Sequence, residues 1–194
     1  MTAFGPSTAL VVVDVQNDFA HPDGTLFVAG APTVIPIINA TAATAVASNS
    51  PVIRTQDWHP PVTPHFASAG GIWPEHCVAD SWGARFHDDL VADGPIVRKG
   101  VGGEDGYSGF TVRDPESGEE SPTELETLLR ERGIDRIVVV GLATDYCVKA
   151  TAIDGARLGF GTTVIADGVA AVDLAPGDGA RAVAAMVDAG VTIT

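Results

Sequence analysis

Short apolar runs rich in β-branched residues recur along the chain, and they constrain its fold more than any other feature. They span residues 10–13, 52–55, 96–98, 137–140 and 162–165, and segments with helical spacing of apolar residues separate them. Near-continuous apolar strands of this kind suit a parallel sheet that is buried on both faces. The sequence therefore predicts an α/β fold, a three-layer, doubly wound and mainly parallel β-sheet with helices on both faces.

The intervening segments carry the start and stop signals of helices. Helices are expected over residues 32–47, 145–158 and 179–189, and an edge strand over 191–193. The best-specified helix starts with a capping box at Ser121 and Glu124, has Pro122 at its first position and ends before Gly133. Two long stretches, 56–92 and 99–120, are expected to be irregular, and the first is too rich in aromatic residues and His to be disordered.

Charge and composition narrow the classes of partner. The 194 residues include 11 Lys and Arg against 25 Asp and Glu, a net charge of -14, which would repel a phosphate backbone and makes nucleic acid a poor partner. The apolar stretch at residues 9–13 is too short for a signal segment or a membrane span, so we expect a cytoplasmic protein without a membrane partner. The length suits one domain over residues 1–194. No heptad or apolar tail marks an interface, which leaves a homo-oligomer open.

Four chemically capable side chains stand at or just beyond the ends of the predicted strands. Asp14 and Lys99 end the first and third runs, Asp57 follows the second, and Cys147 comes a few residues after the fourth. The carboxyl ends of parallel strands meet at one edge of a sheet, and ligands of open α/β sheets bind at that edge. We therefore expect these four side chains to converge on one site.

Each of these residues also has a structural interpretation. Asp14 is compatible with a helix cap and Lys99 with a solvated strand end. Cys147 stands at a helix start, where backbone N–H groups favour a thiolate, but a small buried thiol packing the helix onto the sheet is an equal alternative. Both cysteines, Cys77 and Cys147, are expected to be reduced, because a domain with a large hydrophobic core is not usually stabilised by a single disulfide bond.

The segment RTQDWHPPVTPHF and the later WPEHC contain a carboxylate and three imidazoles in a proline-stiffened loop. The four candidate metal ligands are Asp57, His59, His65 and His76. This set suits one divalent transition metal ion such as Zn, Fe or Mn, although the spacing of the four residues is not that of a Cys/His zinc finger. The alternative is that these are loop histidines satisfied by backbone carbonyls. His21 and His87 are assigned structural or surface roles.

Five motifs together carry a family resemblance. They are VVVDVQNDF, TQDWHPPVTPHF, WPEHCV, RKG and GLATDYCVKAT, and they extend from about residue 9 to about residue 167. The set resembles the nicotinamidase (pyrazinamidase) family of the isochorismatase-like cysteine hydrolase superfamily. The G-x-A-T-D-x-C-V motif is the most specific of them, and D-x-H with the later histidines separates nicotinamidases from relatives that lack a metal.

The resemblance implies a role for each matching position. It implies a catalytic triad of Asp14, Lys99 and Cys147 and the metal ligands Asp57, His59, His65 and His76. It also implies a cis peptide bond between Leu142 and Ala143 and an oxyanion hole from the N–H groups of Ala143 and Cys147. The substrate pocket is expected to contain Phe19, Trp73, Tyr107, Leu142 and Tyr146. Tyr146 stands where some family members carry another residue, often His.

The implied activity is hydrolysis of nicotinamide, and of pyrazinamide, to the free acid and ammonia through a cysteine thioester, in NAD salvage. The residue types suit it, because amide hydrolysis needs a nucleophile, a base and donors for the oxyanion. Three alternatives stay open. They are an amidase for another small amide, ureido or carbamoyl substrate, a metal-dependent hydrolase in which Cys147 only packs, and a non-catalytic binding protein on the same fold.

Overall fold

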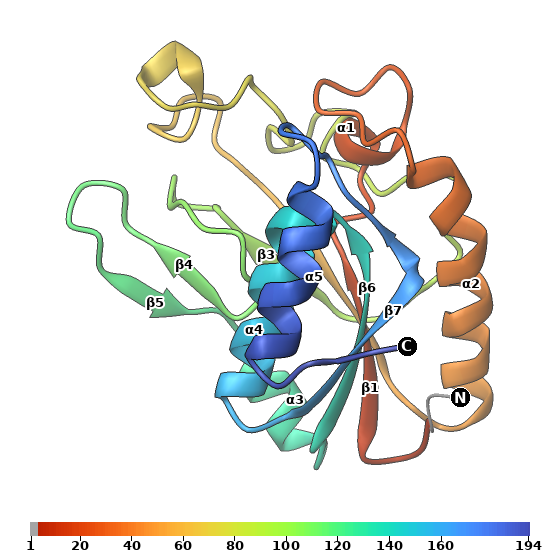
Figure 1. Cartoon of the computed structure of the whole chain (residues 1–194). Helices are drawn as coiled ribbons and strands as arrows, with labels where there is room; N and C mark the ends of the chain where they lie inside the picture. Colours follow the sequence, from red (N-terminus) through yellow and green to blue (C-terminus); the bar gives the residue numbers. More distant parts are fainter. Residues whose placement is uncertain (1–3) are drawn as a thin grey trace.

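A six-stranded parallel sheet runs through the computed structural model, which describes residues 4–194 (Figure 1). The strands are β1 (Thr8–Val13), β2 (Val52–Asp57), β3 (Ile96–Lys99), β6 (Arg136–Leu142), β7 (Gly161–Ala170) and β8 (Thr192–Ile193). Their order in the sheet is β3-β2-β1-β6-β7-β8, and every neighbouring pair is parallel. The chain therefore winds outward from β1 in one direction and from β6 in the other, which makes the β1/β6 border the topological switch point.

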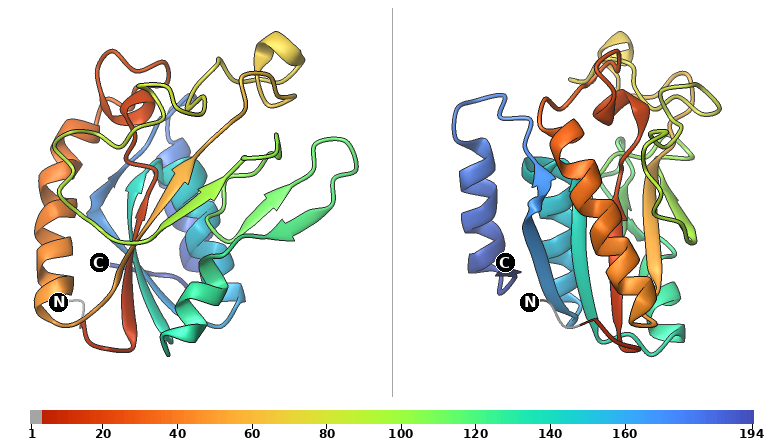
Figure 2. Two further views of the ribbon diagram at one scale, coloured as in Figure 1. Left: turned by 180° about the vertical axis from the view of Figure 1, so that it is seen from behind. Right: turned by 90° about the vertical axis from the view of Figure 1, so that its right-hand side faces the viewer.

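Helices cover both faces of this sheet, as predicted. One face is covered by α2 (Ala31–Ala47), and the other by α3 (Leu125–Glu131), α4 (Lys149–Arg157) and α5 (Asp178–Asp188) (Figures 1 and 2). Two short elements, α1 (Asn17–Ala20) and the 3₁₀ turn η1 (Ala67–Ala69), lie in the connections above the carboxyl ends of the strands. The α/β, doubly wound prediction is confirmed.

The core consists of two apolar clusters, one on each side of the sheet. Along β1, Val11 and Val13 belong to the cluster under α3, α4 and α5, whereas Leu10 and Val12 belong to the cluster under α2. Successive side chains of a strand point to opposite faces, so a strand buried on both sides has to be apolar at every position. All four of these side chains are 0% exposed, which explains the uninterrupted apolar run.

The predicted capping box before α3 is wrong. Ser121 and Pro122 belong to strand β5 (Glu120–Pro122), which pairs with β4 (Thr111–Arg113) in an antiparallel hairpin that projects from the body of the molecule (Figure 2). The helix begins only at Leu125, whose N–H donates to the hydroxyl of Thr123 at 3.1 Å. Residues 99–120 are thus not wholly irregular, since they contain β4 and the first residue of β5.

The helix expected over residues 145–158 has two parts. A five-residue π-helical turn, η2 (Thr144–Val148), forms its start, and regular α-helix α4 begins at Lys149. The turn directly follows β6 and carries Cys147. Within residues 4–194, none of the helices has the length and apolar character needed to cross a membrane.

Candidate active site

The four side chains predicted to converge do so at the carboxyl edge of the sheet. Asp14 comes directly after β1, Asp57 and Lys99 are the last residues of β2 and β3, and Cys147 lies in η2 after β6. Their exposed fractions are only 0%, 5%, 2% and 6%, respectively. The site therefore straddles the topological switch point, and its charged groups are almost entirely shielded from solvent.

Lys99 is at the centre of this group. Its ammonium Nζ lies 2.9 Å from Asp14 Oδ2, donates to Asp57 Oδ1, and lies 3.6 Å from Cys147 Sγ. The other oxygen of Asp14 accepts a hydrogen bond of 2.6 Å from the hydroxyl of Thr55 on β2. A buried ammonium is costly unless it is paired, and here two carboxylates compensate it. Lys99 consequently holds both carboxylates in fixed positions beside the thiol.

The surroundings separate the pKa values of these groups. Burial raises the pKa of Asp14 and of the Cys147 thiol, even though Lys99 acts in the opposite direction on both. Burial alone would also raise the pKa of Asp57. Lys99 and two nearby imidazoles outweigh this effect and lower the pKa of Asp57 to about 2. The pKa of Lys99 is well above its ordinary value, because the two carboxylates outweigh its burial. Burial therefore favours the neutral thiol of Cys147 and also raises the proton affinity of the neighbouring Asp14 carboxylate.

Three of the predicted ligands form a second group beside the first. His59, His65 and His76 each offer a ring nitrogen, and these nitrogens lie within 4.8 Å of one another. Burial lowers the pKa of His76, and it lowers that of His59 to about 4, which favours the neutral imidazoles that metals bind. Asp57, the fourth predicted ligand, directs Oδ2 to within 3.9 Å of His59 Nε2 while Oδ1 accepts from Lys99.

The hydrogen bonds of the imidazoles fit a metal site. Nδ1 of His65 lies 2.7 Å from Asp105 Oδ1, and Nδ1 of His76 lies 2.7 Å from the carbonyl of Pro74. Carbonyl and carboxylate oxygens only accept, so Nδ1 is the donor in both rings, an arrangement that leaves Nε2 of a neutral imidazole available to a metal. Both ring nitrogens of His59 are buried without a hydrogen-bond partner, which is costly for a group with nothing to bind. These residues therefore fit a divalent transition metal ion.

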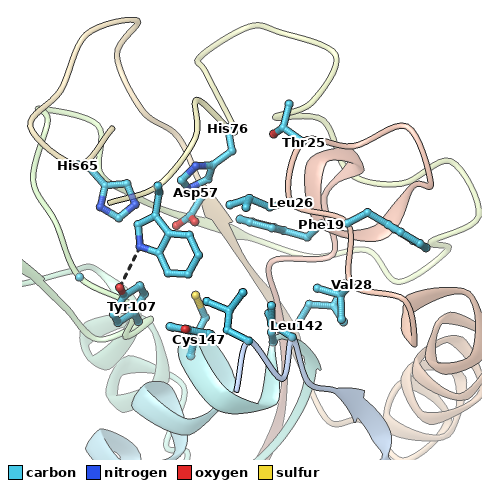
Figure 3. A pocket seen from close by; sticks show the side chains of 17 residues that line it. Phe19, Thr25, Leu26, Val28, Asp57, His65, His76, Tyr107, Leu142 and Cys147 are labelled. Atoms are coloured by element: carbon cyan, nitrogen blue, oxygen red, sulfur yellow. Dashed lines mark hydrogen bonds between the residues drawn. The ribbon is translucent and has the colours of Figure 1, made fainter. Parts of the chain in front are cut away.

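A cavity of about 270 Å³ opens onto both groups. Every predicted pocket residue lines it, and so do Ala143 and Cys147. In Figure 3, His65 and His76 lie on one side of the cavity, Phe19 and Val28 lie on the other, and Cys147 is at its base. The aromatic residues brace one another, since Trp73 Nε1 donates to the Tyr107 hydroxyl at 3.0 Å and the Trp73 and Tyr146 rings meet edge to face. Asp14 and Lys99 are buried and do not line the cavity.

Part of the cavity wall was not anticipated from the sequence. It consists of Thr25, Leu26, Phe27 and Val28 after α1, together with Gly106, Val172 and Leu174. Apart from the hydroxyl of Thr25 these residues carry no polar side-chain group, and all of them lie in connections, so only their position in space marks them. The predicted cis peptide bond between Leu142 and Ala143 is present, and it lies in the wall next to Cys147.

Comparison with known proteins places this arrangement in a family. The isochorismatase domain matches residues 8–194 of the chain. The chain belongs to the isochorismatase family. It is 36% identical over 206 residues to a nicotinamidase of Escherichia coli (strain K12), a match that covers 97% of this chain and 94% of that protein. The predicted membership is therefore confirmed.

Two solved structures agree closely with this chain. One is the pyrazinamidase of Pyrococcus horikoshii in complex with zinc, which is 36% identical, with a TM-score of 0.86 over 97% of this chain and 99% of that one. The other is PnC1 from L. infantum in complex with nicotinate, which is 34% identical, with a TM-score of 0.88 over 100% of this chain and 95% of that one.

In this isochorismatase-family chain, the DVQNDF motif supplies more than the carboxylate of Asp14. The side chain of Gln16 donates from Nε2 to the carbonyl of Asp57 at 2.8 Å and accepts at Oε1 from the N–H of Asp57 at 2.8 Å. Asp18 accepts from the N–H of Cys77 at 2.7 Å and from that of Thr25 at 3.2 Å. The motif therefore ties α1 to the strand end at Asp57, to the histidine loop and to the start of the cavity wall.

Two further carboxylates support the site from a distance in sequence. Asp145, in the ATDYC motif, accepts from the N–H groups of Val172 and Asp173 at 3.0 and 2.9 Å. Asp105 contacts His65, as described above. The sequence placed Gln16, Asp18 and Asp145 inside recognisable motifs, but nothing in it pointed to their partners.

The remaining predictions about cysteine and histidine are consistent with the structure. Both cysteines are free. The His21 and His87 rings lie 5.7 Å apart, and each Nδ1 accepts from a backbone N–H two residues later in the chain. Neither ring lines the cavity or belongs to the group of three imidazoles, in agreement with a structural role.

Proposed function

We propose that the chain is a nicotinamidase, which hydrolyses nicotinamide, and pyrazinamide as a second substrate, to the free acid and ammonia. The observation that carries this proposal is the convergence of Cys147, Lys99 and Asp14 beneath an apolar cavity that also exposes imidazoles. The known activity of the E. coli relative supports it. The physiological role proposed is salvage of nicotinamide toward NAD in the cytoplasm, by a single-domain protein that either acts alone or assembles as a homo-oligomer.

The thiol of Cys147 is the nucleophile in this proposal. As Sγ forms a bond to the carboxamide carbon, Asp14 accepts the thiol proton, and the N–H groups of Ala143 and Cys147 stabilise the negative charge that develops on the carbonyl oxygen. Asp14 then returns the proton to the amide nitrogen as the C–N bond breaks, which releases ammonia and leaves a thioester. Water attacks the thioester, and the free acid leaves with the thiol restored.

Lys99 has a supporting part in this sequence. Its ammonium lies close to Asp14 and to Cys147 Sγ, so it orients the base and stabilises negative charge on sulfur as the proton leaves. The raised pKa of Asp14 matches this task, because a carboxylate of ordinary pKa is a weak base toward a thiol. Aromatic rings of Phe19, Trp73 and Tyr107 would hold the flat pyridine ring over Cys147.

One divalent transition metal ion would be held by Asp57, His59, His65 and His76. The orphaned ring nitrogens of His59 and the free Nε2 atoms of the other two imidazoles support this ligand set. When bound, such an ion supplies a Lewis-acid site for the pyridine nitrogen of the substrate. Zinc, iron and manganese all remain candidates, because a carboxylate with three imidazoles accepts each of them.

Ammonia release from nicotinamide by the purified protein tests the proposal. We expect release that disappears after thiol alkylation, from protein that carries one transition metal ion per chain. Cys147→Ser should lower turnover by several orders of magnitude, because the hydroxyl is a much weaker nucleophile in this site. Cys77→Ser is the matched control, since it changes the other buried thiol, and it should keep most of its turnover. Alkylation-resistant release would instead support a metal-dependent hydrolase in which Cys147 only packs.

Asp57→Ala tests the metal in the same assay. We expect metal content and turnover to fall together, because the variant loses one ligand and also one of the two carboxylates that compensate Lys99. A variant that lost its metal but kept full turnover would contradict the proposed positioning role. Release of ammonia from another small amide, but not from nicotinamide, would keep the site and change the substrate.

A further inference from the structure

The three imidazoles of the candidate metal site differ in what supports them. His76 Nδ1 faces the neutral carbonyl of Pro74, whereas His59 has no hydrogen-bond partner at either ring nitrogen. His65 alone among the three has Nδ1 within 2.7 Å of a carboxylate oxygen, that of Asp105. This carboxylate belongs to the second irregular stretch, in which the sequence assigned roles to Lys99 and Tyr107 but not to Asp105.

Asp105 is held in place by its own backbone and by three groups on its carboxylate. Its N–H and C=O form two hydrogen bonds, of 2.7 and 2.6 Å, with the backbone of Arg113, the last residue of β4. Oδ1 accepts from the N–H of Gly106 at 2.8 Å and faces His65, and Oδ2 accepts from Arg113 Nη2 at 2.8 Å. A carboxylate held by its own backbone and by these neighbours can determine the orientation of the ring that it contacts.

We propose that Asp105 is a positioning residue of the metal site, which acts on the ion through His65. Its negative charge makes Nε2 of His65 a stronger donor, and its fixed position aims that nitrogen at the ion. The inference rests on the proposed metal site and deepens it. Because Tyr107 lies two residues farther on and accepts from Trp73, the same segment also sets the aromatic wall of the cavity.

Arg113 offers a way to separate this role from simple anchoring of the hairpin. It binds the other oxygen of Asp105, and its side chain is 53% exposed, so its removal should leave the fold intact. If Asp105 acts through its charge on His65, loss of the Arg113 side chain frees the carboxylate from a competing cation. The N–H of Gly106 and the backbone pair with residue 113 still hold Asp105 in place, so metal binding is not weakened. If Asp105 only anchors the hairpin, loss of either partner weakens metal binding equally.

The test measures cobalt(II) affinity on metal-free protein by visible absorption, with zinc competition as a second readout. We expect Asp105→Asn to weaken cobalt binding by about 10- to 100-fold, the usual effect of losing such a partner, and to change the visible spectrum. Arg113→Met should bind cobalt at least as tightly as the parent protein. Asp114→Asn is the matched control, because it removes one negative charge from the same hairpin at an exposed residue that contacts no His. It should leave affinity unchanged.

Each outcome bears on the inference. Unchanged affinity in Asp105→Asn, or equal weakening in Asp105→Asn and Arg113→Met, would overturn it while leaving the amidase proposal in place. A parent protein that binds neither metal would overturn the inference and the proposed metal site together, and ammonia release would report separately on Cys147. If Asp105→Asn does not fold, Asp105→Glu and Asp105→Gln are compared instead, because their side chains have the same length and differ in charge. The inference then requires the Glu variant to bind cobalt more tightly than the Gln variant.

Discussion

Gly100, directly after Lys99, stands against the ring of His59. Its φ angle is +79°, and a Cβ atom built at this position would lie 2.5 Å from His59 Nδ1. A side chain here would therefore collide with the ring of a candidate metal ligand. The RKG motif thus has two functions, with Lys99 compensating the carboxylates and Gly100 leaving room for the imidazole.

Gly100→Ala should lose metal affinity by at least about tenfold, which is the scale expected when a ligand is displaced. Gly118→Ala is the matched control, since Gly118 has a similar φ of +73° but nothing within 4 Å of its added Cβ. Both variants should lose about 1 kcal/mol or more of unfolding free energy from backbone strain, as measured by urea denaturation. Only Gly100→Ala should lose metal, as measured by elemental analysis after dialysis. Equal metal content in the two variants would contradict this assignment.

At the level of elements, the site depends on loops that side-chain hydrogen bonds hold together at the carboxyl edge of the sheet. Asp145 in the π-helical turn holds the loop after β7, and that loop carries Val172 and Leu174 of the cavity wall. Gln16 holds the end of β2 in the same way, through the backbone of Asp57. The chemistry thus comes from strand ends, whereas the shape of the cavity comes from the loops that these side chains fasten.

Asp145→Ala should raise KM for nicotinamide by about tenfold and leave kcat much less affected. The two N–H groups of the 172–173 loop lose a charged acceptor, which is worth about 1.5–3 kcal/mol per hydrogen bond, and the loop no longer closes the wall. Asp188→Ala removes the same charge from the exposed end of α5 and serves as the control. Steady-state kinetics of both variants check the prediction, and an unchanged KM in Asp145→Ala would show that the loop keeps its position without the carboxylate.

For the molecule as a whole, the candidate metal site joins segments that are far apart in the chain. The end of β2, the loop at residues 59–76 and, through Asp105, the β4–β5 hairpin all meet there. An ion bound at this point would cross-link them in the folded state and would have no comparable site in the unfolded chain. Metal binding is therefore expected to contribute to stability as well as to substrate positioning.

Chelation should lower the thermal unfolding midpoint. A ligand present at 100 times its Kd stabilises the folded state by about 2.7 kcal/mol, which for a chain of this size corresponds to roughly 5 to 10 °C. Calorimetry of the chelator-treated protein with and without added zinc measures this shift. His76→Ala should show a much smaller shift. A shift of equal size in that variant would assign the stabilisation to zinc bound elsewhere on the acidic surface.

The start of α3 shows where prediction from sequence failed. Ser121, Pro122 and Glu124 form a correct local pattern for a helix start, but Ser121 and Pro122 instead pair with β4. The hydroxyl of Thr123 instead accepts the hydrogen bond from the N–H of Leu125. A short-range signal was overridden because a strand partner, about ten residues earlier in the chain, satisfied the same backbone groups.

The sequence by itself determined the sheet, the strand ends and the family. These follow from patterns that act within a few residues, because strands buried on both faces must be apolar throughout and parallel strands bring their carboxyl ends to one edge. Only the tertiary structure decided which groups touch. It brought the imidazoles together, placed Asp105 behind His65 and added residues 25–28 and 172–174 to the cavity. These contacts join segments tens of residues apart, and packing of the whole chain sets such distances rather than any local pattern.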